Sequence, residues 1–516
     1  MTLNGYLFIA TGIILLLIVI SHRRRMRSKL PPGPHRLPII GNTHQAPNSA
    51  PWLTFQKWIQ QYGPLVSVDF GGTTVVLIGD YDIAKDLLDK RGNVYSARPR
   101  MVMAAELTCK EHHILIRQPD ARYMLHQRLE APVLSPRAST TYTPVQDMES
   151  KVLLHNFLRD YEVTKNCEIY AASIAYILTY GFRVVTNDEW QMDAARAVND
   201  NFVRAAQPGA WVVDAFPVMK MLPACIAPFK KKAENFWRYE TDLHLSNLRE
   251  ALNREGYNWC KDFVLAKEAK DMPEEELAWD LGVLADAAIE TSNVFLQTFI
   301  LACVAYPEFM TTARKEIDGL VGQHEPRMPE FADLENLPYI HAVVEEVFRW
   351  HHILPAGVAH ATLKDDWYNG FFIPKGSTIV PVWKAMREDT KRYDEPLHFR
   401  PERWTGKNGQ SNNWGYGRRI CTGRHIAKNT ITIAVARLLW AFDIKPANGD
   451  RIEVDDSMFT EGFVSHPKPF EAVFQPRSEA HREVIETAYD NAEKDVQSLM
   501  ATVRYNQQQM GLKLRV

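Results

Sequence analysis

Cysteine is scarce in this sequence, and none of it is paired. The 516 residues include six cysteines, without the short spacing of a zinc ligand pair or a local disulfide. This pattern argues against a disulfide framework and fits a reducing compartment. Each cysteine is therefore interpreted by itself: Cys109, Cys167, Cys225, Cys260, Cys303 and Cys421.

The sequence also lacks an excess of charge and an internal linker. A formal net charge of −2 argues against nucleic acid as a partner. No Gly/Ser-rich stretch divides the chain, and 46% hydrophobic with 24% charged residues is the composition of a globular protein. We therefore expect one large domain, although this length could hold two or three.

The N-terminal apolar run lacks the features of a cleaved signal peptide. Residues 3–20 are nearly all apolar and would span about 27 Å as a helix. Positive charge follows this run, from Arg23 to Lys29, rather than preceding it, and no small-residue cleavage site is present. We expect a transmembrane signal anchor over residues 1–21, a single pass in the endoplasmic reticulum membrane, with the remainder facing the cytosol. Residues 22–42 would be a basic stop and a proline-rich hinge.

The most informative stretch lies near the C-terminus, from Trp414 to Gly423. It reads Trp-Gly-Tyr-Gly-Arg-Arg-Ile-Cys-Thr-Gly and precedes an apolar helical run from Ile426 to Phe442. Glycines allow a tight backbone that can approach a flat cofactor, and a helix N-terminus with nearby arginines favours a thiolate. Cys421 is thus a candidate metal ligand or nucleophile, and a buried structural cysteine is the alternative.

The spacing of this stretch resembles the cytochrome P450 family, the haem-thiolate monooxygenases. The family motif is Phe-x-x-Gly-x-Arg-x-Cys-x-Gly, and Trp414 stands where phenylalanine is usual. The resemblance implies that Cys421 is the axial ligand of the iron of heme b and the one metal ligand. It also implies that the other motif residues lie at the cofactor: Trp414, Gly417, Arg419 and Gly423.

A second motif lies in a predicted buried helix over residues 277–304, which is hydrophobic almost all round. Ala-Ala-Ile-Glu-Thr-Ser at 287–292 resembles the family's Ala/Gly-Gly-x-Asp/Glu-Thr-Thr/Ser. The resemblance implies that small Ala288 lets the helix pass close to the porphyrin. Glu290 and Thr291 are the catalytic candidates, because a carboxylate and a hydroxyl can relay protons during oxygen activation. The alternative is a threonine bonded to its own helix.

A third motif combines Glu346-x-x-Arg349 with Phe-Arg-Pro-Glu-Arg-Trp at 399–404. Glu346 and Arg349 share one helix face. The resemblance implies that Arg403 completes a buried structural triad with them. Such a triad contributes conformational specificity more than net stability.

The family's Trp-x-x-x-Arg motif, which holds a haem propionate, is altered here. Tyr123 and Gln127 replace its two residues, and His126 or Arg128 could donate to the carboxylate instead. A basic, solvated helix face is the alternative. His360 aligns with another position that donates to a propionate in the family.

The remaining pattern indicates a mainly α fold with small β-sheets, as the resemblance also implies. Residues 65–70 and 74–78 read as a β-hairpin, and two short strands flank an Asn-Gly turn at 369–370. Prolines and glycines at 207–228 interrupt a helical stretch where the family has its substrate-access lid. The haem-thiolate domain would cover residues 43–476, and residues 477–516 would be a polar helical tail.

The implied reaction inserts one oxygen atom from O₂ into a hydrophobic small molecule. In detail, the sequence is similar to those of fungal family members that act in secondary metabolism. NADPH electrons would come from a separate NADPH-cytochrome P450 reductase, because no flavin or nucleotide module is visible, with cytochrome b5 as a further donor. The docking surface would carry Arg418, Arg419, Arg424 and Lys428. Two alternatives stay open: oxidative coupling, dehydration or isomerisation without oxygen insertion, and a non-enzymatic haem sensor.

Overall fold

The computed structural model describes residues 29–323, 325–406, 413–449, 451–512 and 515. The predicted membrane anchor, residues 1–21, lies outside this part of the chain. The chain forms two compact units. Among the described residues, the first comprises those of 29–99, 356–386 and 416–418, and the second comprises those of 100–355, 387–415 and 419–515.

The first unit is built on a four-stranded sheet in the order β1-β2-β6-β3. The predicted hairpin is confirmed, because β1 (Leu65–Phe70) pairs antiparallel with β2 (Thr73–Ile78) across Gly71 and Gly72, which both have positive φ. β6 (Thr378–Pro381) then adds in parallel to β2, some 300 residues later in the chain, and β3 (His360–Ala361) closes the sheet. The predicted Asn-Gly turn is also confirmed: it joins β4 (Asp366–Tyr368) to β5 (Phe371–Ile373).

The helices of the first unit are short, and several of them directly precede or follow a strand of this sheet along the chain. Asp80 caps the first turn of α3 by accepting from the backbone N–H of Asp82 and Ile83. The helix begins at Tyr81 and widens after Ala84 into a π-helical turn. These elements are η1 (Thr43–Gln45), α2 (Pro51–Tyr62), α3 (Tyr81–Ala84), η2 (Lys85–Lys90), α4 (Gly92–Tyr95) and α16 (Trp383–Arg387).

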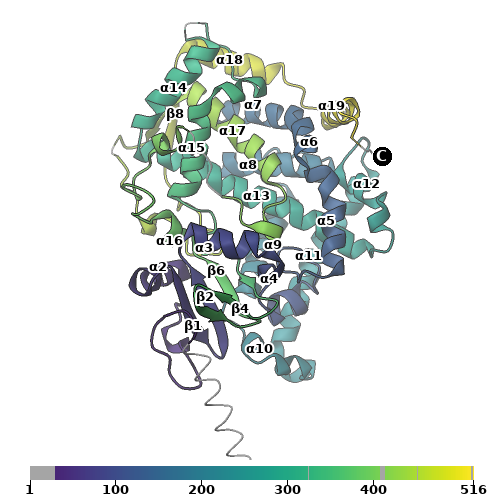
Figure 1. The fold of residues 1–516 in the computed structure, drawn as a ribbon. Helices are drawn as coiled ribbons and strands as arrows, with labels where there is room; N and C mark the ends of the chain where they lie inside the picture. The colour runs from purple at the N-terminus through teal and green to yellow at the C-terminus, as the bar shows by residue number, and fades with distance from the viewer. Residues whose placement is uncertain (1–28, 324, 407–412, 450, 513–514, 516) are drawn as a thin grey trace, which may run out of the picture. The chain divides into compact units, whose positions relative to one another are not determined.

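The second unit is a helical bundle around α13 (Glu274–Ala305), which covers the helix predicted at 277–304. α8 (Val163–Tyr180) and α17 (Arg424–Ala441) pack against α13, and α7 (Thr143–Arg159) packs against both of those helices (Figure 1). Most residues of α13 from Leu277 to Ala305 are buried. Within the described residues, α13 is the one helix long and apolar enough to cross a membrane, and its burial identifies it as a core helix.

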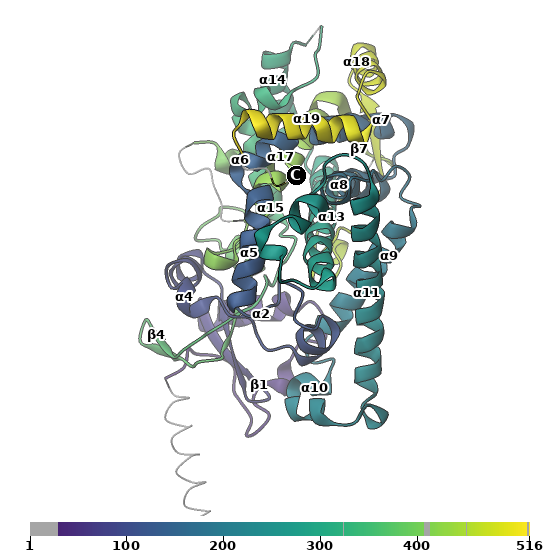
Figure 2. The same cartoon turned by 90° about the vertical axis from the view of Figure 1, so that its right-hand side faces the viewer.

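The predicted interruption after residue 206 is confirmed. α9 (Trp190–Ala206) ends there, three short turns follow, and the chain then runs into the long α11 (Pro228–Asn253). Figure 2 shows α11 running beside α13 and α9. The short turns are α10 (Val212–Ala215), η5 (Pro217–Met221) and η6 (Ala224–Ile226).

The C-terminal tail is helical, as predicted, but part of it is buried. α18 (Glu479–Asp490) and α19 (Val496–Gln509) both pack on α7. Leu499, Met500 and Val503 are buried, so the tail belongs to the hydrophobic core of the second unit. The antiparallel pair β7 (Phe442–Pro446) and β8 (Ala472–Pro476) leads into it.

Further elements complete the second unit. They are η3 (Val102–Thr108), α5 (Ala121–Leu134), α6 (Pro136–Ser139), η4 (Thr140–Tyr142), α12 (Trp259–Val264), η7 (Lys267–Ala269), α14 (Glu308–Val321), η8 (Phe331–Asn336), α15 (Pro338–Trp350), η9 (Pro401–Trp404) and η11 (Asp456–Met458). The short turn η10 (Gly417–Arg419) lies where the chain passes from one unit to the other.

Candidate functional site

The cysteine loop is closed by its own backbone. The N–H of Cys421 donates to the carbonyl of Trp414 over 2.8 Å, which brings the two ends of the predicted motif together. Gly417 has a positive φ of 53°, and a Cβ there would come 2.2 Å from the carbonyl oxygen of Leu88. Position 417 therefore requires glycine.

Cys421 is one of two exposed cysteines in the described residues, and Cys225 is the other. Desolvation by the surrounding protein raises the pKa of the Cys421 thiol, whereas the N–H groups of Gly423 and Arg424 and the Arg424 charge lower it. The charge of Arg424, which follows the cysteine, therefore favours the thiolate. From the sequence, this role had been expected of the arginines that precede the cysteine. The ring of Trp414 packs edge-on against Phe348 of α15, with 5.0 Å between the ring centroids.

A short accessible face interrupts the burial of α13 at the second motif. Ala287 and Ala288 are exposed between the buried residues Ala285 and Ile289. The hydroxyl of Thr291 donates to the carbonyl of Ala287 over 2.8 Å, which is the bond within the helix that was weighed from the sequence. At positions 287, 288 and 291 this face presents two methyl groups and a hydroxyl, so a flat ring could lie close to it there.

Glu290 is held by groups outside α13. Its Oε1 lies 2.6 Å from Nε2 of His466 and accepts from Nδ2 of Asn199 in α9 over 3.4 Å. Glu290 thus connects α13 to α9 and to the segment before β8. Neither His466 nor Asn199 was singled out in the sequence, because both contacts join residues far apart in the chain.

His126 is engaged by two carboxylates of α13. Its Nδ1 lies 2.7 Å from Asp280 and its Nε2 lies 2.8 Å from Glu276, and the imidazole is fully buried. Arg122, one turn earlier on α5, also binds Glu276. In this arrangement both ring nitrogens of His126 are occupied by protein groups.

The other propionate candidates of the second unit differ from His126. The guanidinium of Arg419 lies 4.0 Å from the ring centroid of Tyr123 and donates to the carbonyl of Arg117 over 2.6 Å. Gln127, which replaces the family's arginine, donates to the Tyr123 hydroxyl over 2.9 Å. Arg128 is exposed. In the first unit, Nδ1 of His360 lies 2.8 Å from the carbonyl of Tyr95.

The structure brings the three residues of the predicted triad together. Arg349 donates twice to the carboxylate of Glu346, at 2.8 Å from Nε and 2.8 Å from Nη2, and Arg403 donates from Nε over 3.1 Å. Two further donors were not predicted from the sequence: the indole N–H of Trp404 and the backbone N–H of Arg400, each at 2.8 Å from the carboxylate. All five hydrogen bonds converge on one buried carboxylate.

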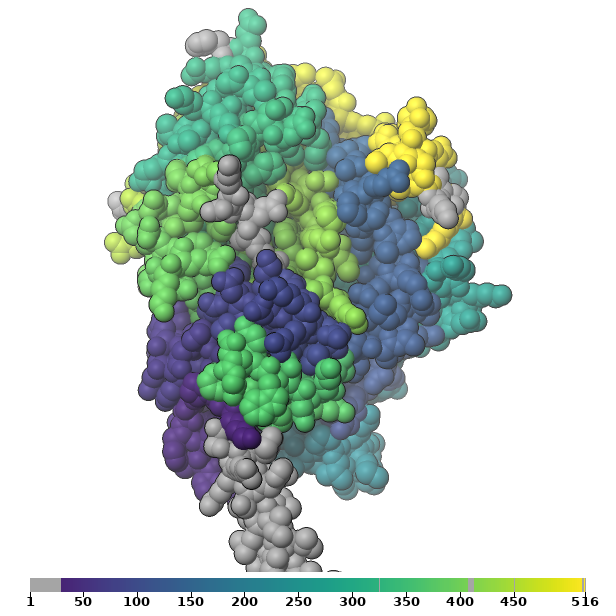
Figure 3. Space-filling model, viewed as in Figure 1, coloured from purple at the N-terminus to yellow at the C-terminus, as the bar shows by residue number. Residues whose placement is uncertain are grey.

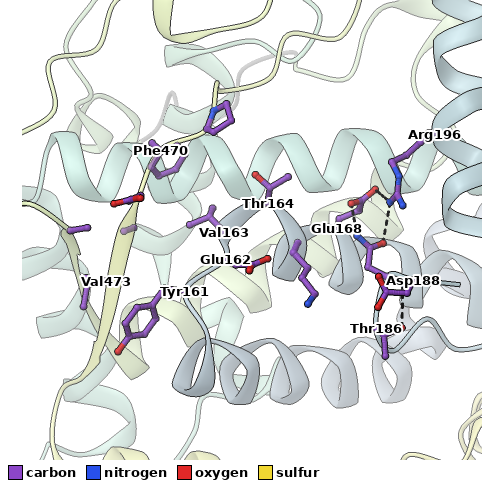
Figure 4. Close-up of a pocket in the computed structure, with 16 residues that line it drawn as sticks. Tyr161, Glu162, Val163, Thr164, Glu168, Thr186, Asp188, Arg196, Phe470 and Val473 are labelled. Carbon is purple, nitrogen blue, oxygen red and sulfur yellow. Dashed lines mark hydrogen bonds and ion pairs between the residues drawn. The ribbon is translucent and has the colours of Figure 1, made fainter.

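A surface pocket lies apart from these residues. It is formed where the start of α8 faces β8, and Figure 4 shows Val163, Phe470 and Val473 on its walls. Glu168 and Arg196 form an ion pair of 3.0 Å at its margin. The pocket contains none of the motif residues, so we assign it no catalytic role.

The charge on His126 should make stability depend on pH. Burial alone lowers the pKa of His126, but the bonds to Asp280 and Glu276 outweigh it and raise the pKa to about 9. The unfolded value is about 6.5, so this contribution is complete below pH 6.5 and disappears as the pH rises through 9. By linkage it is at most about 3 kcal/mol.

We expect His126→Gln to lower the thermal midpoint strongly at pH 6.5 and much less at pH 9.5. Thermal unfolding of both proteins at both pH values measures this. His44→Gln, at an exposed position, is the control and should leave the midpoint unchanged. A deficit of equal size at the two pH values would contradict the charged state of His126.

Comparison with known proteins agrees with this geometry. A family model described as Cytochrome P450 matches residues 31–474. Cytochrome P450 monooxygenase aneD of Aspergillus aculeatus is 37% identical over 483 residues, which cover 92% of this chain and 94% of the relative. Cytochrome P450 monooxygenase FrzL of a Cladobotryum species is 34% identical, with 94% of each chain covered.

A helical fold with an exposed cysteine on a closed loop and a small-residue face on its central helix fits a haem-thiolate protein. The chain belongs to the cytochrome P450 family. Its activity is that of a monooxygenase, an oxidoreductase of the EC 1.14 type, and its relatives are fungal monooxygenases. These matches favour oxygen insertion over the two alternatives raised from the sequence.

The residues of the second unit fit a haem. Cys421 offers an exposed sulfur, and Ala287 and Ala288 offer a flat, unobstructed helix face. α13 and α17, which begins three residues after the cysteine, pack against each other. A haem bound here would supply the redox chemistry of oxygen activation.

Proposed function

We propose that the protein hydroxylates or epoxidises a hydrophobic small molecule of fungal secondary metabolism, with heme b ligated by Cys421. The observation that carries the proposal is the exposed thiol on a loop closed by the bond between Cys421 and Trp414. Protein N–H groups at 423 and 424 stabilise negative charge on that sulfur. Kinship with monooxygenases from fungi supports the substrate class.

The other motif residues have separate roles in this proposal. Thr291 and Glu290 hold and move protons at the accessible face of α13, Thr291 through its hydroxyl and Glu290 through its carboxylate. Ala288 keeps that face flat, and Arg419 supplies positive charge for a propionate. Tyr123, His126, Arg128 and His360 remain predicted propionate contacts. For His126 such a contact would require release from Glu276 or Asp280.

Isotope labelling with ¹⁸O₂ tests the reaction class. Purified protein with reductase, NADPH and ¹⁸O₂ should place one labelled oxygen atom in the product and the other in water. Untargeted comparison of metabolites with and without this gene would provide the substrate. A product without label would favour coupling, dehydration or isomerisation.

We also propose that electrons arrive from a separate NADPH-cytochrome P450 reductase, with cytochrome b5 as a second donor. Residues 421–429 are exposed or half-buried, whereas the rest of α17 is buried. Figure 3 shows this part of the chain, in yellow-green, on the surface beside the blue segments that include α5 to α7. Lys428 and Arg424 lie on this stretch. Arg419 is a weaker docking candidate than the sequence suggested, because it packs on Tyr123.

Charge reversal at Lys428 tests the docking surface. Lys428→Glu should slow transfer of the first electron by roughly tenfold at low ionic strength, and salt should reduce the difference. Stopped-flow reduction under carbon monoxide measures the rate. Lys445→Glu, on β7, is the matched control and should leave the rate unchanged. Equal rates for Lys428→Glu and the unaltered protein would remove Lys428 from the docking surface.

We propose that the catalytic part rests on the endoplasmic reticulum membrane through the turns between α9 and α11, in addition to the anchor at 1–21. These turns carry large apolar side chains in contact with solvent, Met221 being 84% exposed. Lys230, Lys231 and Lys232 follow at the start of α11, where they could meet lipid headgroups. Four further exposed apolar side chains lie on these turns: Val212, Phe216, Val218 and Ile226.

A variant without residues 1–28 separates the two contributions. We expect it to remain largely bound to liposomes with anionic lipids, and the further changes Phe216→Glu and Met221→Glu to release most of it. Sedimentation with the liposomes measures the bound fraction. Leu397→Glu, at another exposed apolar position, is the control. Release by the control to the same extent would contradict a specific membrane surface.

A further inference from the structure

α11 and α13 enclose a histidine that the motifs do not explain. His244 of α11 lies against Gly282 of α13, where a Cβ would come 2.1 Å from its Nδ1. The imidazole also meets the ring of Trp279 edge-on, with 5.5 Å between the centroids. Gly282 is therefore the residue that admits this ring to the interior of the bundle.

His244 makes no hydrogen bond in the described part of the chain. Its side chain is 1% exposed, and both ring nitrogens lack a partner. Nε2 points to two carboxyl groups at longer range, 3.6 Å to Glu240 and 3.8 Å to Asp286. A buried imidazole without hydrogen bonds is costly, so its position needs a functional or structural reason.

The groups around His244 are largely uncharged. Burial lowers the pKa of His244, although the Asp286 charge opposes this. Burial also raises the pKa of Glu240 well above its ordinary value, so Glu240 keeps its proton. His244 therefore supplies no full positive charge to Asp286.

Asp286 differs from Glu240 and His244 because its side chain is accessible to solvent. Its side chain is 26% exposed, directly before the exposed Ala287 and Ala288 and one turn before Glu290. Burial raises the pKa of Asp286 to about 7; the Glu290 charge adds to this rise, and His244 opposes it. From α8, Tyr176 and Tyr180 also lie within electrostatic range of it. Glu290 has His466 as a partner, whereas Asp286 has no hydrogen bond among the described residues.

We propose that Asp286 determines substrate specificity by binding a positively charged nitrogen of the substrate, with His244 fixing the wall behind it. The two carboxylates Asp286 and Glu290 lie one turn apart on the accessible face of α13, and no cation of the described chain pairs with Asp286. A substrate cation would supply that missing partner in a poorly hydrated place, where such pairing is strong. The substrate class is then a hydrophobic amine, and the proposal rests on the monooxygenase function above.

The experiment uses the full-length holoenzyme, accepted only when its reduced-CO spectrum has the band of a thiolate-ligated haem. This step distinguishes failure of the proposed function from failure of the Asp286 proposal. The probes are (4-phenylbutyl)trimethylammonium and its neutral carbon isostere. A quaternary nitrogen keeps its charge at every pH and cannot coordinate iron. Equilibrium dialysis gives the two dissociation constants.

We expect Asp286→Asn to weaken binding of the cation by roughly 10- to 100-fold and to change binding of the isostere by less than about twofold. For the unaltered protein, affinity for the cation should rise with pH up to about 7, as Asp286 ionises, and then level off. Asp193→Asn, at an exposed position of α9, is the control.

Two results would overturn the proposal. One is equal binding of the cation by the unaltered protein and Asp286→Asn. The other is affinity for the cation that does not rise with pH between 5.5 and 7.5 in the unaltered protein, a measurement that needs no variant to fold.

Discussion

Cys421→Ser is expected to lose the reduced-CO band of a thiolate-ligated haem completely, together with all NADPH-dependent product formation. Sulfur is the soft, easily ionised donor that a haem-thiolate site requires, and a serine hydroxyl stays protonated at neutral pH. The substitution replaces the sulfur atom with oxygen. It leaves intact the hydrogen bond between the N–H of residue 421 and the carbonyl of Trp414. Loss of the band should therefore occur in a folded protein.

Cys225→Ser is the matched control, because Cys225 is the other exposed cysteine in the described residues. This variant should keep the spectrum and the activity of the unaltered protein. The other four cysteines, Cys109, Cys167, Cys260 and Cys303, are buried, so a cofactor could not reach their sulfur atoms. A thiolate-type band that persists in Cys421→Ser would show that our assignment of the ligand is incorrect.

Glu346→Gln is expected to have the second large effect, on folding and haem retention. Glu346 is fully buried and accepts from Arg349, Arg403, Trp404 and the backbone of Arg400. The amide would present N–H groups to some of these donors and leave the buried Arg349 guanidinium without a counter-charge. Breaking one partner of a buried ion pair costs about 3–5 kcal/mol.

The measurement is the thermal midpoint of the holoenzyme and its rate of haem loss at a fixed temperature. Glu308→Gln is the control, because Glu308 forms an exposed ion pair of 3.3 Å with Arg451. Such surface pairs contribute about 0–1 kcal/mol. If Glu346→Gln and Glu308→Gln had equal midpoints, the buried cluster would have no special role in stability.

Much of the architecture could be predicted because it is encoded locally. The alternation of apolar residues around Gly71-Gly72 predicts the β1–β2 hairpin, and the continuous apolar run predicts α13 within three residues at each end. The prolines and glycines after residue 206 predict where α9 ends and α11 begins. These features depend on residues that are neighbours in the sequence.

The missed features are contacts over long sequence distances. The parallel addition of β6 to β2 joins segments about 300 residues apart, and no local pattern announces it. The same is true of His126, which sequence analysis treated as a candidate for a propionate, whereas in the structure it lies between Asp280 and Glu276. One sequence does not show which acidic residues of another helix a histidine will contact.

In the candidate site, too, the motif residues could be predicted and the contacts between distant segments could not. The triad was predictable because family spacing placed Glu346, Arg349 and Arg403 in motifs, but Trp404 was seen only as part of the wording and not as a donor. Asp286 was passed over because it stands directly before the six-residue motif, and its accessibility depends on the helices that surround α13.

The backbone closure of the cysteine loop has a consequence for how this protein can diverge. The bond from the N–H of Cys421 to the carbonyl of Trp414 uses no side-chain atoms. The side chains at 414 and 422 can therefore change without loss of this bond, and position 414 carries tryptophan where the family usually has phenylalanine. The loop fixes the position of one sulfur atom and leaves its surroundings open to variation. Lineages of this enzyme could thus adjust the electronic properties of the ligand by single substitutions while keeping the ligand in place.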